Sequence, residues 1–145
     1  MSVQTVDGDK KMILPNGALV AVIDGERMRL FRNVGHEPRI RLTALPVPHL
    51  RVGNTGSGSR HRSSSANPDG ARINEDDFTA AAAAYLNRDV LRGASGKVLI
   101  IADRRTLGEL RKHFHPALYS KLLGEITKGL TSHSEKEIQA AIVAA

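Results

Sequence analysis

The sequence contains no cysteine and no tryptophan, and only 3% of its 145 residues are aromatic. Without cysteine the chain can form neither disulfides nor thiolate metal sites, and thiol catalysis is excluded. The six histidines show no spacing typical of metal ligands, so we expect neither a metal ion nor a cofactor. Because aromatic rings are scarce, any RNA binding should depend on shape or on the phosphate backbone rather than on base stacking.

Long apolar runs are also missing from the N-terminal part of the chain. The short run that begins at Ile13 is broken at once by Pro15, Asn16 and Gly17. This pattern predicts neither a secretory signal nor a membrane span. We therefore expect a cytoplasmic protein without membrane contact, built as a flexible tail over residues 1–11 and a single α/β domain over residues 12–145.

Positive charge is abundant. The net charge is +6, and 14 of the 21 basic residues are arginine, whose planar guanidinium suits phosphate groups. An anionic partner such as RNA or the ribosome is consistent with this composition, although moderate basicity also aids solubility. The sequence does not indicate an oligomeric state.

The first half of the chain predicts an antiparallel meander. Residues 18–23 are apolar and end at Asp24-Gly25, a typical hairpin turn, and residues 27–31 and 39–42 alternate between polar and apolar. The alternation predicts an inward row of Met28, Leu30, Ile40 and Leu42 and an outward row of Arg27, Arg29, Arg39 and Arg41. The outward row either faces solvent or binds an anion that neutralises it.

Residues 53–70 are rich in glycine and serine and contain no aliphatic or aromatic residue larger than alanine, which predicts a flexible loop. Asn74 is the candidate N-cap of the helix that follows, with Glu75, Asp76 and Asp77 in its first turn and Gly93 and Gly96 closing it.

Residues 97–102 form a continuous apolar run, typical of a central strand that is buried on both faces. The next helix is capped either by Asp103 or by a capping box of Thr106 and Glu109. Pro116 predicts a break near His115 and a fresh turn. Residues 122–127 suit a strand, although a helix fits their first half equally well, and Ser134 with Glu137 predicts a capped terminal helix.

The resulting order, βββαβαβα, is that of the ribonuclease H-like α/β fold, a mixed sheet with helices packed on it. Four stretches, LPNGALVAVIDGERMRLFRN, DDFTAAAAAYLNR, ADRRTLGELRKHFHPAL and GEITKGLTSHSEKEI, resemble the bacterial host-attachment protein family over roughly residues 12–143. Members of that family are similar in fold to the middle domain of archaeal and eukaryotic peptide-chain release factors, which implies a role linked to RNA or the ribosome. The family supplies no catalytic residues. The chain also lacks the Gly-Gly-Gln motif of those release factors, so the resemblance does not imply peptide release.

The helix after Asp103 holds the candidate binding residues. A glycine inside a helix costs about 1 kcal/mol relative to alanine, so Gly108 requires an explanation. Either another backbone packs against it, or an anionic backbone approaches it between basic side chains. The second interpretation predicts a nucleic-acid site formed by Arg104, Arg105, Gly108, Arg111, Lys112 and His115.

A metal-dependent nuclease is the enzymatic alternative. In a ribonuclease H-like sheet, Asp24 and Asp103 lie at the same edge, near Glu75, Asp76 and Asp77, where carboxylates could hold two divalent metals. Each of these acids also has a structural interpretation in a turn, a helix cap or a helix dipole. We therefore expect a non-enzymatic module that interacts with RNA or the ribosome, with a nuclease or a factor in host-cell attachment as alternatives.

Overall fold

A computed structural model describes residues 13–47, 49–50, 68–93 and 96–145, with side chains from Asn74 onward in the third of these segments. The predicted tail over residues 1–11 and residues 53–67 of the predicted loop lie outside this description. Within the described part of the chain, no helix has the length and apolar character needed to cross a membrane.

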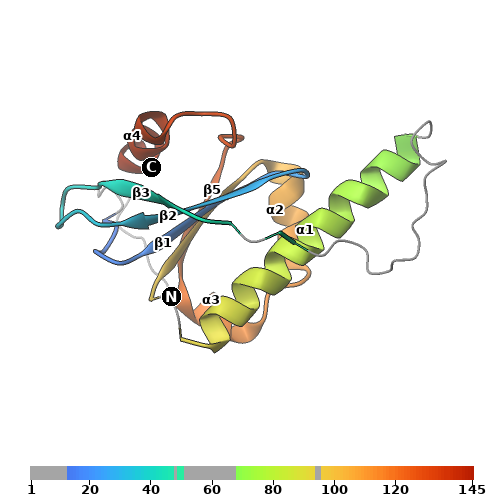
Figure 1. Cartoon of the computed structure of the whole chain (residues 1–145), viewed down its shortest axis with the longest axis horizontal. Helices are drawn as coiled ribbons and strands as arrows, with labels where there is room; N and C mark the ends of the chain where they lie inside the picture. Colours follow the sequence, from blue (N-terminus) through green and yellow to red (C-terminus); the bar gives the residue numbers. More distant parts are fainter. Residues whose placement is uncertain (1–12, 48, 51–67, 94–95) are drawn as a thin grey trace.

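Five strands form one mixed sheet in the order β3-β2-β1-β4-β5 (Figure 1). The pairs β1·β4 and β4·β5 are parallel, whereas β1·β2 and β2·β3 are antiparallel. The strands are β1 (Leu19–Ile23), β2 (Met28–Asn33), β3 (Leu42–Leu45), β4 (Val98–Ala102) and β5 (Leu122–Thr127). The sheet confirms the predicted α/β class, and the last segment is the predicted strand rather than a helix.

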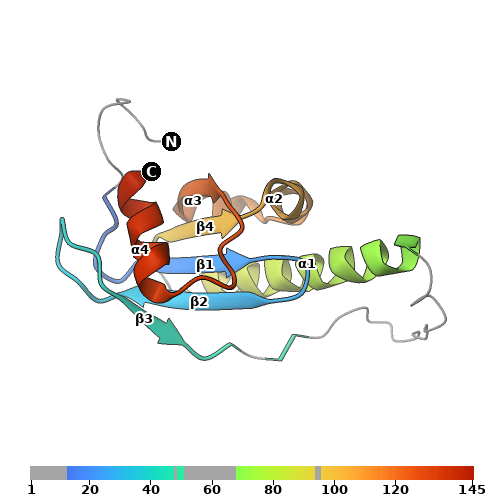
Figure 2. The same cartoon turned by 90° about the horizontal axis from the view of Figure 1, so that it is seen from above.

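Four helices cover the two faces of the sheet. They are α1 (Pro68–Leu91), α2 (Arg104–Arg111), α3 (Pro116–Lys121) and α4 (Glu135–Ala144). Helix α4 packs on one face, and α1 to α3 supply the apolar side chains against the other (Figures 1 and 2). The order is therefore βββαβααβα. It differs from the predicted order by α3, which forms because Pro116 at the first helical position starts a separate helix.

The two central strands are buried on both faces. Every residue of β1 and β4 is buried. In β1, Leu19, Ala21 and Ile23 face helices α1 to α3, while Val20 and Val22 face α4. This accounts for the continuous apolar runs of the two strands, since a strand between two helical layers has no polar face.

The predicted inward row of the meander is buried or partly buried, but its four side chains do not share one face of the sheet. Met28 and Leu30 pack toward α1, but Leu42 packs with Phe31 on the opposite face, beside α4. Ile40 precedes β3, which starts only at Leu42. Just before β3, the backbone N–H of Arg41 donates to the side chain of Asn33, and the Arg41 carbonyl accepts from the N–H of Val34.

The predicted outward row of arginines is wrong, because Arg29 does not face solvent with the others. Its Nη1 atom donates to the carbonyl oxygens of Thr131 and His133, at 3.1 and 2.6 Å, and its guanidinium carbon lies 5.0 Å from the ring centroid of Phe31. Arg29 therefore holds the segment before α4 against the sheet. Arg39 and Arg41 are exposed but lie outside the strands.

Helix α1 begins earlier than the sequence predicts. Its first residue is Pro68, so Asn74 is not the N-cap and residues 68–70 belong to the helix, not to the loop. Proline suits the first helical position because the missing N–H would have no partner there. The acids Glu75, Asp76 and Asp77 consequently lie beyond the first turn. Gly93, with φ of 72°, follows the C-terminus as predicted.

The cap of α4 is as predicted. The Oγ of Ser134 accepts a hydrogen bond from the backbone N–H of Glu137 at 3.1 Å, and the Glu137 carboxylate accepts one from the Ser134 N–H at 2.9 Å. The backbone hydrogen bond from Ser134 is the main cause that lowers the pKa of Glu137. This reciprocal pair satisfies two backbone donors at the start of the helix.

A single buried side chain, Asn33 at the end of β2, joins three segments. Its amide nitrogen donates to the carbonyls of Leu14 and Pro15, and its oxygen accepts from the N–H groups of Gly35 and Arg41. Asn33 thus ties the entry to β1 to the β2–β3 connection.

Replacing Asn33 with alanine should lower the free energy of unfolding by about 3 kcal/mol, because buried backbone groups lose their partners. Denaturation by urea, followed by circular dichroism, measures this loss. Asn16→Ala is the matched control, since Asn16 donates one hydrogen bond to the carbonyl of Gly35 at the surface. It should cost less than about 1 kcal/mol, and an equal loss in both variants would contradict the role of Asn33.

Candidate nucleic-acid interface

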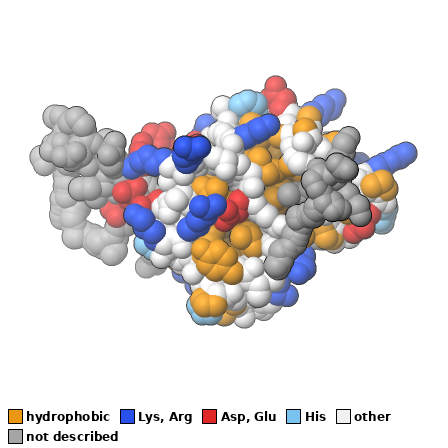
Figure 3. Space-filling view, turned by 180° about the vertical axis from the view of Figure 1, so that it is seen from behind, with side chains coloured by type: hydrophobic (Ala, Val, Ile, Leu, Met, Phe, Trp, Pro, Cys, Tyr) orange, Lys and Arg blue, Asp and Glu red, His pale blue; other side chains and the backbone are white. Residues whose placement is uncertain are grey.

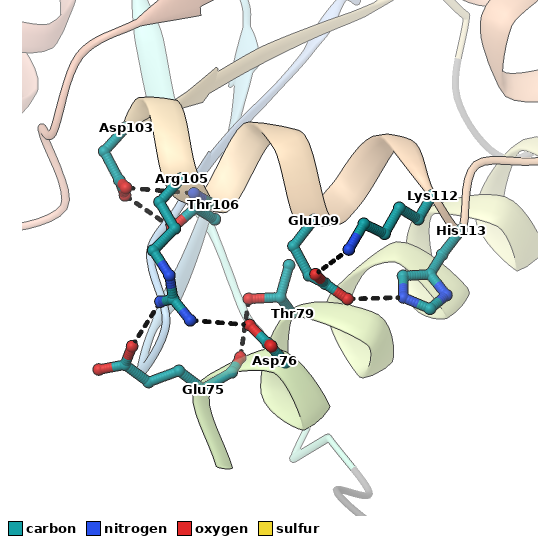
Figure 4. Close-up of polar contacts among 9 residues, drawn as sticks. All are labelled: Glu75, Asp76, Thr79, Asp103, Arg105, Thr106, Glu109, Lys112 and His113. Carbon is teal, nitrogen blue, oxygen red and sulfur yellow. Dashed lines mark hydrogen bonds and ion pairs between the residues drawn. The ribbon is translucent and has the colours of Figure 1, made fainter. Parts of the chain in front are cut away.

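Helix α2 begins where β4 ends, and Asp103 fixes the start. Its carboxylate accepts hydrogen bonds from the backbone N–H of Thr106 at 3.1 Å and from the Thr106 hydroxyl at 2.7 Å (Figure 4). Of the two predicted caps, Asp103 is therefore the one that forms, and the capping box of Thr106 and Glu109 is wrong. Leu107 and Leu110 are buried on the sheet side, which turns the opposite side of α2 outward.

Four cations surround Gly108 on that outward side. Arg104, Arg105, Arg111 and Lys112 stand four and three residues before and three and four residues after it, the positions that neighbour it on a helix surface. All four are exposed. We call Gly108 with these four side chains the basic face.

Gly108 itself is open. A Cβ atom placed on it would meet nothing within 4 Å among the described residues. No backbone of the described residues packs against Gly108, which contradicts the packing interpretation for this part of the chain.

Arg105 of the basic face is paired with acids of α1. Its guanidinium contacts Glu75 at 2.7 Å and Asp76 at 3.1 Å (Figure 4). These contacts join the start of α2 to α1. The two acids were predicted in a first helical turn, and the sequence offered no sign of their partner on a helix 29 residues later.

Two further cations of the basic face also have acidic partners. Arg111 forms an ion pair with Glu125 of β5, and the hydrogen bond that its guanidinium donates to this carboxylate raises the pKa of Arg111. Lys112 contacts Glu109 at 3.1 Å, and His113 contacts the same carboxylate at 3.2 Å (Figure 4). The hydrogen bond from Lys112 is the main cause that lowers the pKa of Glu109.

The result is a surface of mixed charge. The view from behind shows Lys and Arg side chains interspersed with Asp and Glu rather than gathered into a patch of one sign (Figure 3). Within the described residues, the side chain of Arg104 makes no ion pair or hydrogen bond, which sets it apart from the other three cations.

His115 does not belong to the basic face. Helix α2 ends at Arg111, and His115 is the N-cap of α3, where its Nδ1 accepts a hydrogen bond from the N–H of Ala117 at 2.9 Å. Its own N–H donates to the side chain of Asn87 on α1. The break that Pro116 introduces thus removes His115 from the predicted site and gives it a structural role.

The acids of the nuclease hypothesis lie at one edge, as expected for a parallel pair. Ile23 is opposite Ala102, so Asp24 and Asp103 both follow at the same end of β1 and β4. Each has local partners: Asp24 accepts hydrogen bonds from the N–H groups of Glu26 and Arg27 and from the hydroxyl of Thr131. Within the described part of the chain, no three His, Asp or Glu side chains come together as metal ligands.

Partial burial by itself would raise the pKa of Asp24. The hydrogen bond from Thr131, with those from the N–H groups of Glu26 and Arg27, outweighs burial and lowers the pKa below its ordinary value. Asp24 thus links the β1–β2 turn to the segment before α4.

The sheet order 3-2-1-4-5, with its helices on both faces, defines a ribonuclease H-like α/β domain of the type found in release factors. A sequence profile described as bacterial archaeo-eukaryotic release factor family 12 matches residues 17–142. The chain belongs to this family, which bears out the predicted relationship to release factors, while the host-attachment name finds no support in the match. No curated protein matches the sequence.

A first prediction concerns the openness of Gly108. Because a Cβ atom meets nothing there, Gly108→Ala should raise the free energy of unfolding by about 0.5–1 kcal/mol. Gly17→Ala is the control, since Gly17 has φ of 89°, and it should be destabilising. Both effects are measurable by urea denaturation. If Gly108→Ala destabilised the protein, the residue would have a packing partner after all.

A second prediction concerns pH. The lowered pKa of Asp24 makes its ionised form stabilising, so this contribution is present above the unfolded value of about 3.8 and is lost as pH falls through the lower folded value. Asp24→Asn should therefore unfold at a lower temperature than the wild type near neutral pH, and the difference should shrink below about pH 4. Thermal unfolding across this range tests it; a difference that stays constant with pH would contradict the assignment.

Proposed function

We propose that the protein is a non-enzymatic module that binds RNA on the ribosome or in another ribonucleoprotein, and that the basic face of α2 contacts the phosphate backbone. The observation that carries the proposal is the open glycine among four cations. An exposed glycine lets a polynucleotide backbone approach the helix closely, and the side chains around it can reach phosphate oxygens on either side.

The ion pairs on the basic face do not oppose this function. The side chains of Arg105, Arg111 and Lys112 are 44%, 53% and 69% exposed. The pairs of Arg105 with Glu75 and Asp76 are exposed on both sides and contribute about 0–1 kcal/mol each, so a phosphate can replace these carboxylates at small cost. Arg104 has no acidic partner to give up among the described residues. The pairs also hold the guanidinium groups in defined places before RNA arrives.

Membership in a release-factor family is consistent with a role on the ribosome, and such a role places the protein in the cytoplasm. Peptide release is not part of the proposal, because the sequence contains no Gly-Gly-Gln. Nor do we propose a nuclease or a factor in host-cell attachment. We do not propose a nuclease because the carboxylates of Asp24 and Asp103 already accept structural hydrogen bonds. No observation on the described residues supports a role in host-cell attachment.

Reversing the two cations of the basic face that lack tertiary ion pairs tests the function. Arg104→Glu with Lys112→Glu should weaken binding to single-stranded and duplex RNA and to purified ribosomes. The slope of log affinity against log salt should become shallower by about 0.7–0.9 for each phosphate that the variant no longer binds. Binding titrations by fluorescence anisotropy at several salt concentrations measure both quantities, and circular dichroism verifies that the fold is retained.

Two further variants separate a site from a general charge effect. Arg39→Glu with Lys136→Glu changes the net charge equally at exposed positions before β3 and on α4, and it should leave most of the affinity intact. Gly108→Leu keeps every charge but blocks close approach, so it should weaken binding as the reversal does. Equal losses in the reversal and its control would show that only net charge matters, and unchanged binding in all variants would refute the basic face as the site.

A further inference from the structure

A groove lies along α1 on a flank that α2 does not touch. Its volume is about 410 Å³, which is within the range of small-molecule sites, and it lies between α1 and the segment that follows β3. The lining residues are His49, Leu50, Ala81, Ala84, Tyr85, Arg88 and Arg92. The five residues from α1 recur at helical spacing and form one stripe, and the small side chains of Ala81 and Ala84 leave the space open.

The groove is distinct from the basic face. Helix α1 meets α2 and α3 through other residues: Asp76 contacts Arg105, and Asn87 accepts from the N–H of His115 and donates to the carbonyl of His113. Those residues lie on a different side of α1 from the stripe that lines the groove.

One end of the groove is cationic. Arg88 and Arg92 stand one turn apart, an arrangement in which like charges repel. Neither guanidinium forms an ion pair or hydrogen bond within the described residues. The C-terminal dipole of α1 favours positive charge at this place, but it does not explain an open hollow beside the two arginines.

The other end is apolar and carries an aromatic ring. Leu50 is 9% exposed and belongs to the core beneath α1, and Tyr85, partly buried, packs against the same cluster. A flat ring supported in this way offers a face on which a base can stack. A fatty acid would need a longer apolar channel than one leucine, two alanines and a tyrosine provide.

We propose that this groove binds a nucleotide, with the phosphate held by Arg88 and Arg92 and the base against Tyr85 and Leu50. Arginine pairs with phosphate through two parallel hydrogen bonds, so two such side chains can hold one phosphate from both sides. The nucleotide is either a free mononucleotide or the phosphorylated end of an RNA strand. Nucleotide binding in the groove does not depend on RNA binding by the basic face.

Titration calorimetry with AMP and UMP, adenosine, inorganic phosphate, and a short RNA with or without a 5′-phosphate tests the site. A mononucleotide should bind at least about tenfold more tightly than either adenosine or phosphate alone, because both ends of the groove contribute. Binding of the mononucleotides identifies a free nucleotide as the ligand. Binding of only the 5′-phosphorylated RNA identifies a strand end, and both results support the site.

Two variants and a control locate the binding in the groove. Arg88→Gln with Arg92→Gln should reduce affinity by about tenfold or more, through the loss of charge-assisted hydrogen bonds. Ala84→Leu should reduce it by filling the hollow while leaving all charges in place. Lys128→Gln with Lys136→Gln, two exposed lysines that do not line the groove, is the control and should leave mononucleotide affinity unchanged.

Four outcomes would overturn the proposal: no binding of any probe, equal binding of phosphate and AMP, full affinity in both groove variants, or an equal loss in the control. Because mononucleotide binding is read separately from binding of unphosphorylated RNA, a failure here leaves the function of the basic face untouched.

Discussion

The parallel pairing of β1 with β4 is the constraint on which the rest of the structure depends. Both strands are buried over their whole length, so they join the two helical layers into one core. Their register, with Ile23 opposite Ala102, makes both strands end at the same edge. Asp24 and Asp103 stand directly after these ends, and their carboxylates close the β1–β2 turn and start α2. The pairing thus determines where α2 leaves the sheet, and the burial of Leu107 and Leu110 then turns the opposite side of the helix outward.

The cations on the outward side of α2 have a structural role, and the proposed function gives them a second role as phosphate contacts. Arg105 joins α2 to α1, and Arg111 joins it to β5, so these side chains help to position the helix. Such exposed pairs contribute little stability each, and their cations keep most of their capacity to contact another anion. Gly108 lies between these cations, and because it has no side chain, a polynucleotide backbone could approach the helix closely there. The arrangement suits a ligand whose charges are spaced along a backbone better than a single compact anion.

The two flanks of α1 differ in their chemistry. One flank contacts α2 and α3 through polar and charged residues, and the other forms a groove with two arginines and a tyrosine. We propose a phosphate backbone as the ligand of the basic face and one nucleotide with its base as the ligand of the groove. The chain is a member of a release-factor family and contains no Gly-Gly-Gln, so the proposed function is RNA binding and does not include peptide release.

The sequence by itself determined the elements whose signal is local. The buried strand β4, the turn at Asp24-Gly25, the capping box of Ser134 with Glu137 and the break at Pro116 follow from hydrophobic pattern and from hydrogen bonds within a few residues. These elements also sufficed for the fold class. Only the tertiary structure decided the faces of the meander, because a buried Asn33 and the contacts of Arg29 with the segment before α4 come from residues far apart in the chain. For the same reason it alone decided that Glu75, Asp76 and Glu125 pair with the basic face and that Gly108 is open. Pairing and exposure depend on what packs nearby, and no local pattern encodes that.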